Sequence, residues 1–184
     1  IIFWWMSTRE PEVETANTTT TSEIEGAPET TNNTVNETAF ENDSLKQINI
    51  QNKLGAFAQS AINASKGISI LENEVVKLTI DNKGGQIKSA LIKNFKTYDS
   101  LPLYMIKDNN ASFNINFGTT DNRILNTKNL FFQPTITKNG DNQVVSMKLK
   151  VSETQFLEYR YEMKPKDYMV NFSVRSQGLS NVIN

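Results

Sequence analysis

The sequence predicts an all-β fold, an antiparallel β-sandwich preceded by a short helix. Three observations predict it: apolar and polar residues alternate along most of the chain after Gly67, turn-forming residues separate the alternating runs, and helix-like periodicity ends near that glycine. Parallel strands are covered on both faces and would give continuous apolar runs instead. We therefore expect the β-sandwich to occupy residues 67–184.

The composition limits the chemistry that the chain can perform. Its 184 residues are 38% hydrophobic and 21% charged, which suits one domain with a sizeable core and a tail. There is no Cys and no His, which removes a thiol nucleophile, the commonest metal ligand and the middle member of a Ser-His-Asp triad. Glu158 and Glu162 lie on one strand face, which favours surface charge over a glycosidase pair. We expect no metal, no cofactor and no enzymatic activity.

Charge is divided unevenly along the chain. Nine of the 20 acidic residues precede Ser44, together with a single basic residue, Arg9. From Ser44 onward 18 basic residues face 11 acidic ones, an excess of seven positive charges (18 − 11). This excess indicates either a solvated surface with scattered Lys or attraction to anionic lipid headgroups. No cluster of Lys and Arg interleaved with aromatic residues indicates nucleic-acid binding.

The chain begins with a short apolar run. It is too short to cross a bilayer, which takes about 20 apolar residues, but paired Trp at the edge of such a run is typical of a membrane interface. We interpret residues 1–6 as the end of a transmembrane helix; an exposed apolar terminus of a soluble protein is the alternative. The predicted membrane anchor consists of Ile1, Ile2, Phe3, Trp4, Trp5 and Met6.

A polar segment and a helix are predicted to follow. Residues 7–43 are rich in Thr, Asn, Glu and Ser, and too poor in apolar side chains to offset the entropy of ordering, so we expect a disordered acidic tether. Residues 44–66 are predicted to form an amphipathic helix, because Ser44 and Gln47 can make a capping box. It packs either on the β core or on a membrane surface. Its apolar stripe consists of Leu54, Phe57, Ala58, Ala61 and Ile62.

Within the β-sandwich, the turn from Asp81 to Gly85 joins two strand patterns in a hairpin. Each alternating run is expected to have one polar face. The aromatic residues among them are predicted to fill the core, with a ligand-stacking cleft as the alternative. The apolar positions are Val76, Leu78 and Ile80; Ile87 to Ile92; Phe113, Ile115 and Phe117; Val145, Met147, Leu149 and Val151; Leu157, Tyr159, Tyr161 and Met163; and Tyr168, Val170, Phe172 and Val174.

Several segments, in order, resemble the large periplasmic domain of the YidC membrane-insertase family, in particular its Bacteroidetes-like members. They are Leu54-Gly55-Ala56-Phe57-Ala58, the hairpin from Leu71 to Ile87, the strand from Leu91 to Tyr98, and the strand-turn-strand from Tyr161 to Phe172. The residues that carry the resemblance, with expected structural roles, are Gly84, Gly85, Lys93, Asp167 and Tyr168.

The resemblance implies a galactose mutarotase-like β-supersandwich on the periplasmic side of the bacterial inner membrane, here truncated at its C-terminal end. It also implies contacts with the Sec translocon, SecDF and nascent membrane proteins, while the insertion groove belongs to later membrane helices. Mutarotase chemistry uses His together with a carboxylate, and this chain has no His. A carbohydrate-binding or sugar-modifying domain is the alternative.

Overall fold

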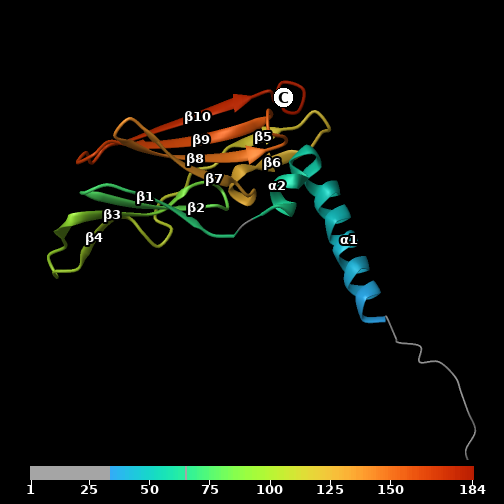
Figure 1. Ribbon diagram of the computed structural model, residues 1–184, viewed down its shortest axis with the longest axis horizontal. Helices are drawn as coiled ribbons and strands as arrows, with labels where there is room; N and C mark the ends of the chain where they lie inside the picture. Colours follow the sequence, from blue (N-terminus) through green and yellow to red (C-terminus); the bar gives the residue numbers. More distant parts are fainter. Residues whose placement is uncertain (1–33, 65) are drawn as a thin grey trace, which may run out of the picture.

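Residues 34–64 and 66–184 are described by a computed structural model, drawn in Figure 1. Two four-stranded antiparallel sheets stack face to face and confirm the predicted all-β sandwich. The predicted anchor, Ile1 to Met6, and residues 7–33 of the predicted tether lie outside the described residues, whereas residues 34–43, predicted as part of the disordered tether, are helical. The first sheet has the order β1-β2-β3-β4, formed by Ile68–Glu72, Val76–Asp81, Ile87–Lys96 and Pro102–Ile106. The second has the order β10-β9-β8-β7, formed by Val170–Gln177, Phe156–Met163, Asn142–Lys150 and Gln133–Asn139.

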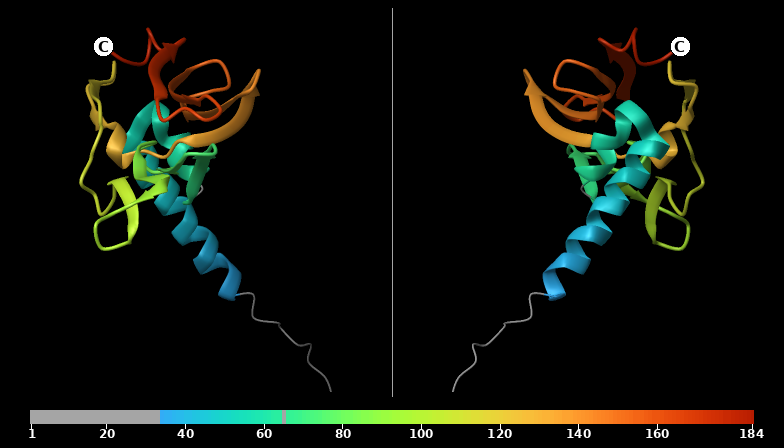
Figure 2. Two further views of the ribbon diagram at one scale, coloured as in Figure 1. Left: turned by 90° about the vertical axis from the view of Figure 1, so that its left-hand side faces the viewer. Right: turned by 90° about the vertical axis from the view of Figure 1, so that its right-hand side faces the viewer.

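The core lies between the two sheets, where the period-two pattern places it. On β2 every second side chain is buried, as predicted for Val76, Leu78 and Ile80. The inward side chains of β8 and β9 are also at most 8% exposed, but four side chains on the opposite face are buried as well: Val144, Ser146, Phe156 and Glu158. A small β5–β6 pair, Asn116–Gly118 and Ile124–Asn126, with the short 3₁₀ turn η2, Thr127–Asn129, lies at the end of the sandwich next to the helices (Figures 1 and 2).

The helical region differs from the single helix predicted for residues 44–66. The first helix, α1, runs from Thr34 to Leu54, so Ser44 lies inside it and caps nothing. No Pro or Gly interrupts the sequence between these ends. At Gly55 the backbone turns to φ +56, because a glycine tolerates this left-handed conformation, and the chain continues as the 3₁₀ helix η1, Gly55–Phe57, and α2, Ala58–Ile62.

Only the C-terminal side of this helical region packs on the sandwich. Phe57 is 0% exposed and contacts Phe117 edge to face at 5.3 Å between ring centroids. Arg123 donates from Nε to the carbonyl oxygen of Asn52 at 3.1 Å, near the C-terminal end of α1. The rest of α1 projects away from the sheets (Figure 2). None of the helices in the described part of the chain is both long and apolar enough to span a membrane.

Two predicted strand segments differ in the structure. Phe113 and Ile115 do not belong to a strand, because their N–H groups donate to the side chains of Gln86 and Thr127 instead of to a neighbouring strand. On β10, Phe172 and Val174 are 42% and 39% exposed, and Tyr168 before it is 47% exposed. The prediction that Tyr168 and Phe172 fill the core is therefore wrong. Phe172 lies on β10, the edge strand of the second sheet, and Tyr168 lies in the turn before it.

Candidate functional site

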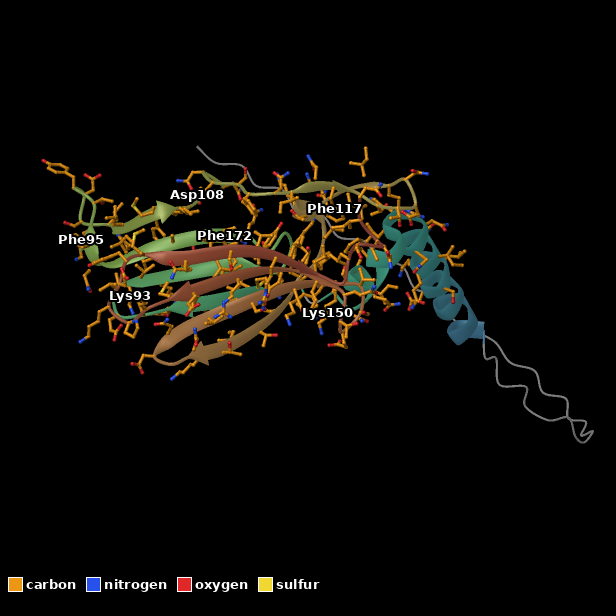
Figure 3. All side chains as sticks on the ribbon, turned by 90° about the horizontal axis from the view of Figure 1, so that it is seen from above. Lys93, Phe95, Asp108, Phe117, Lys150 and Phe172 are labelled. Atoms are coloured by element: carbon orange, nitrogen blue, oxygen red, sulfur yellow. The ribbon has the colours of Figure 1, made fainter. Side chains whose placement is uncertain are left out.

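Three turns meet at the end of the sandwich farthest from α1, which we call the hairpin end. They are the β1–β2 turn at residues 73–75, the β3–β4 turn at 97–101 and the β9–β10 turn at 164–169. Figure 3 shows Lys93 and Phe95 at this end, whereas Phe117 and Lys150 lie toward the helices. Lys93, Asp167 and Tyr168, which carry the family resemblance and are far apart in the sequence, therefore lie at the same end of the sandwich.

The side chain of Asn73 connects two of these turns. Its Nδ2 donates to the carbonyl oxygens of Lys164 and Asp167, both at 2.7 Å, across more than 90 residues of sequence. Its Oδ1 accepts hydrogen bonds from the N–H groups of Val75 and Val76 at 2.9 and 2.7 Å. Asn73 is 9% exposed, so these four backbone groups depend on it in place of water. We call this arrangement the Asn73 junction.

Lys93 joins the junction from β3. Its Nζ donates to Glu72 Oε1 at 2.8 Å and to the carbonyl oxygen of Asn73 at 2.9 Å. The hydrogen bond from Lys93 holds the pKa of the Glu72 carboxyl below its ordinary value, with a further contribution from Lys77. The structure thus brings Lys93 and Asp167 to one residue, Asn73, which the sequence interpretation did not single out. The only local signal for Asn73 was its position in a turn before Val75 and Val76.

The other predicted motif residues take no part in the hydrogen bonds of the Asn73 junction. Tyr168 faces Phe95, with 6.3 Å between ring centroids. Gly84 and Gly85 form the β2–β3 turn, with φ of +85 and +63. The N–H of Gly84 donates to the carbonyl of Leu130 at 2.8 Å, and the carbonyl of Gly85 accepts from the hydroxyl of Tyr161 at 2.7 Å. This turn ties the first sheet to the second.

A polar pocket of about 320 Å³ adjoins the Asn73 junction. Acidic and basic groups both line it: Glu72, Glu74 and Asp141, together with Lys93, which pairs with Glu72. Over residues 34–64 and 66–184, no group of three or more His, Cys, Asp or Glu side chains is arranged to hold a metal ion. The pocket's hydrogen-bonding groups are largely taken up by the junction itself, so its arrangement is that of a structural connection between sheets.

An apolar cleft of about 260 Å³ opens between the sheets beside β10. Phe113 and Phe172 form its aromatic wall and pack edge to face at 5.2 Å between ring centroids. Tyr161 contributes its ring, which lies 4.8 Å from that of Phe172, but its hydroxyl already bonds to Gly85. No charged side chain is among the lining residues, and the polar ones are Gln86 and Ser112. A sugar needs several hydrogen-bonding groups, so this cleft suits apolar groups better.

Charged residues on the outer face of the second sheet are held in networks. Glu158 is 2% exposed, which corrects the expectation of a solvated carboxylate. Burial opposes its ionisation, but hydrogen bonds from Arg175 and Ser146 outweigh burial and hold the pKa of the Glu158 carboxyl below its ordinary value. Glu162 accepts hydrogen bonds from Asn142, Asn139 and Arg160 at 2.8 to 2.9 Å. Both carboxylates are kept ionised, whereas a glycosidase needs one with a raised pKa.

The network around Glu162 predicts a change in acid stability. The Asn142, Asn139 and Arg160 hydrogen bonds lower the pKa of the Glu162 carboxyl from 4.5 to about 2. Because the folded pKa is the lower one, the stabilisation is complete above about pH 4.5 and is lost as the pH falls toward about 2. We expect Glu162→Gln to be less stable than wild type near neutral pH, with the difference shrinking through this interval. Urea unfolding across a pH series measures it.

Asp141→Asn is the control for Glu162→Gln. Asp141 is exposed and takes part in none of the ion pairs of the described residues. Its free energy of unfolding is expected to run parallel to that of the wild type between these pH values. A Glu162→Gln curve that also stays parallel would show that the network does not stabilise the ionised carboxylate.

Comparisons with known proteins identify similar sequences. A family model described as the YidC periplasmic domain matches residues 69–181, well over half of the chain. The membrane protein insertase YidC of Parabacteroides distasonis is 35% identical over 141 residues, and that of Porphyromonas gingivalis is 34% identical over 140 residues. These matches cover 77% and 76% of this chain but 22% of each relative. The YidC of Cytophaga hutchinsonii is 28% identical over 96% of the chain and 27% of that protein.

Proposed function

Because the chain belongs to the YidC family of membrane protein insertases, we propose that it acts as an accessory domain that contacts other proteins on the periplasmic side of the inner membrane. The match of the family model over residues 69–181 carries this proposal. The chain spans about a fifth to a quarter of the relatives' length, so the insertion groove is proposed to lie in the rest of the protein. The partners proposed are the Sec translocon, SecDF and nascent membrane proteins.

The exposed apolar face of β10 supports a second part of this proposal. Phe172 and Val174 are about 40% exposed although they occupy the inward positions of a sheet. Leaving apolar side chains exposed forgoes roughly 25 cal/mol per Å² of burial. We propose that further chain of the full-length protein covers this face. Amide hydrogen exchange along β10 should then be slower in the full-length protein than in residues 1–184, and equal rates would contradict the proposal.

A sugar-modifying activity has less support. The chain has no His to serve as a general base, and hydrogen bonds hold both carboxylates ionised, from Arg175 and Ser146 at Glu158 and from Asn142, Asn139 and Arg160 at Glu162. The apolar cleft lacks charged lining residues. A role without catalysis agrees with all three observations.

Site-specific photo-crosslinking in cells tests the accessory role. The full-length protein would carry a photo-reactive amino acid at Ile70, Ile124 or Ile136, which are 42%, 85% and 60% exposed on different elements. We expect at least one position to form crosslinks with Sec translocon subunits or SecDF. Leu78 is 2% exposed in the core and serves as the matched control, since a probe there should crosslink only within the chain. If all three exposed positions capture no membrane protein, the proposed role is wrong.

A further inference from the structure

Exposed apolar side chains gather on the turns of the hairpin end. Tyr98 is 103% exposed, which means that its ring contacts nothing else in the described residues. Four further apolar side chains, on or next to the β3–β4 and β9–β10 turns, are also exposed by 47% to 72%. Apolar residues exposed singly on a protein need no explanation, whereas several of them on neighbouring turns indicate a contact surface. We call this group the aromatic tip; it consists of Phe95, Tyr98, Leu101, Tyr168 and Met169.

Local hydrogen bonds hold the aromatic tip in this exposed arrangement. In the β3–β4 turn the N–H of Thr97 donates to the carbonyl of Leu101 at 2.8 Å, and the N–H of Leu101 donates to Thr97 Oγ1 at 3.2 Å. In the β9–β10 turn the N–H of Met169 donates to Asp167 Oδ1 at 3.0 Å. The contact between Phe95 and Tyr168 joins the two turns, and the Asn73 junction anchors the second turn from behind. The exposure is therefore part of the folded state.

Basic side chains flank the aromatic tip. Lys96 follows Phe95 on β3, and Lys164 is the first residue of the β9–β10 turn; both are exposed and belong to none of the ion pairs of the described residues. Across residues 95–101 and 164–169 three lysines, Lys96, Lys164 and Lys166, face two aspartates, Asp99 and Asp167, and the whole region from Ser44 onward has an excess of seven positive charges. Long Lys side chains can lay their stems on apolar surface and extend the ammonium group to a headgroup phosphate. This combination is complementary to an anionic lipid surface.

The shape and size of the aromatic tip favour a bilayer over a protein partner. A stable protein interface takes about 20–30 residues on each side, whereas this surface consists of five side chains on two protruding turns. Tyr is among the residues enriched at the interface between membrane and water. A protruding turn can enter the headgroup layer without needing a complementary pocket. Membership of a membrane protein family places a bilayer within reach of the domain.

We infer that the aromatic tip docks the domain on a membrane surface that contains anionic lipid, with Tyr98 and Leu101 entering the headgroup region. The hairpin end then faces the bilayer and orients the sandwich relative to it. This inference rests on the family assignment and not on the accessory role, so either can fail without the other.

A single fluorescent probe at the tip tests the inference. The chain has no Cys, so Ser100→Cys in residues 1–184 gives one labelling site between Tyr98 and Leu101. With an environment-sensitive dye there, vesicles of phosphatidylethanolamine and phosphatidylglycerol should raise the emission and shift it to the blue. Replacing Tyr98 and Leu101 by Ser should lower the vesicle affinity reported by the tip label by about tenfold or more, because both side chains are expected to bury apolar surface in the membrane interface.

Two comparisons make the result decisive. Ser152→Cys labels the β8–β9 turn, which lies beside α2 at the other end of the sandwich, and should stay in an aqueous environment. Every protein compared keeps residues 1–6, so binding through that apolar run contributes equally to all of them. The inference is overturned if the two labels respond alike, if Tyr98→Ser with Leu101→Ser leaves the tip response unchanged, or if the tip responds only to membranes that contain proteins.

Discussion

Replacing Asn73 by Ala should destabilise the domain by about 2–4 kcal/mol, because four backbone groups lose the side chain that satisfies them. Ala fills the space only in part and offers neither a donor for the carbonyls of Lys164 and Asp167 nor an acceptor for the N–H groups of Val75 and Val76. The melting temperature should fall by roughly 10 °C, measured by thermal unfolding followed by circular dichroism.

Asn171→Ala is the matched control for the Asn73 junction. Asn171 lies on β10, is exposed, and its side chain makes none of the hydrogen bonds described above. Its replacement should change the free energy of unfolding by less than about 0.5 kcal/mol. Equal melting temperatures for the two variants would show that Asn73 does not connect the sheets.

Replacing Gly85 by Ala should cost about 3 kcal/mol for two separate reasons. Its φ of +63 disfavours any residue with a Cβ. The added Cβ would also lie 3.0 Å from Cγ of Phe132 and 3.1 Å from Cδ2 of Tyr159, inside the packed core. Moving the turn to relieve this contact would disturb the hydrogen bond from the Tyr161 hydroxyl to the Gly85 carbonyl.

Gly140→Ala separates the two reasons. Gly140 has nearly the same φ, +60, but a Cβ built there has no atom within 4 Å. This variant should lose only the conformational part, about 1 kcal/mol. Urea unfolding of both variants measures the difference. If Gly85→Ala is no less stable than Gly140→Ala, the close packing of the β2–β3 turn against Phe132 and Tyr159 contributes nothing.

The sequence alone predicted the strands in which apolar and polar residues alternate. Val76, Leu78 and Ile80 alternate with polar or partly exposed neighbours, and the pleat of a strand translates that alternation directly into a buried and an open face. The turn at Gly84 and Gly85 was likewise predicted from its residues. By contrast, β7 was not predicted, since Pro134 and its polar neighbours suit an edge strand and carry little apolar signal.

Only part of the candidate site could be predicted from the sequence. The family resemblance named Lys93 and Asp167, but not the reason that they matter together, which is that both contact Asn73. Asn73 and Asp167 are 94 residues apart, so no local pattern connects them. The helix was also mispredicted at Gly55, because the sequence gives a helical period on both sides of it, whereas packing of Phe57 on the sandwich selects a left-handed backbone there.

What the sequence by itself determined was therefore the fold class, most of the strands and the family, since these depend on the residue pattern along the chain. Only the tertiary structure decided which side chains are buried by neighbouring elements and which stay exposed. Phe172 has the alternation of a core residue and yet is 42% exposed, because it lies on β10, the edge strand of the second sheet, and lines the open apolar cleft. Glu158 has the pattern of a surface residue and yet is 2% exposed, because Arg175 and Ser146 bind its carboxylate from neighbouring strands. Whether a side chain is buried depends on its neighbours in space, whereas a period of two specifies only the face of the strand on which that side chain lies.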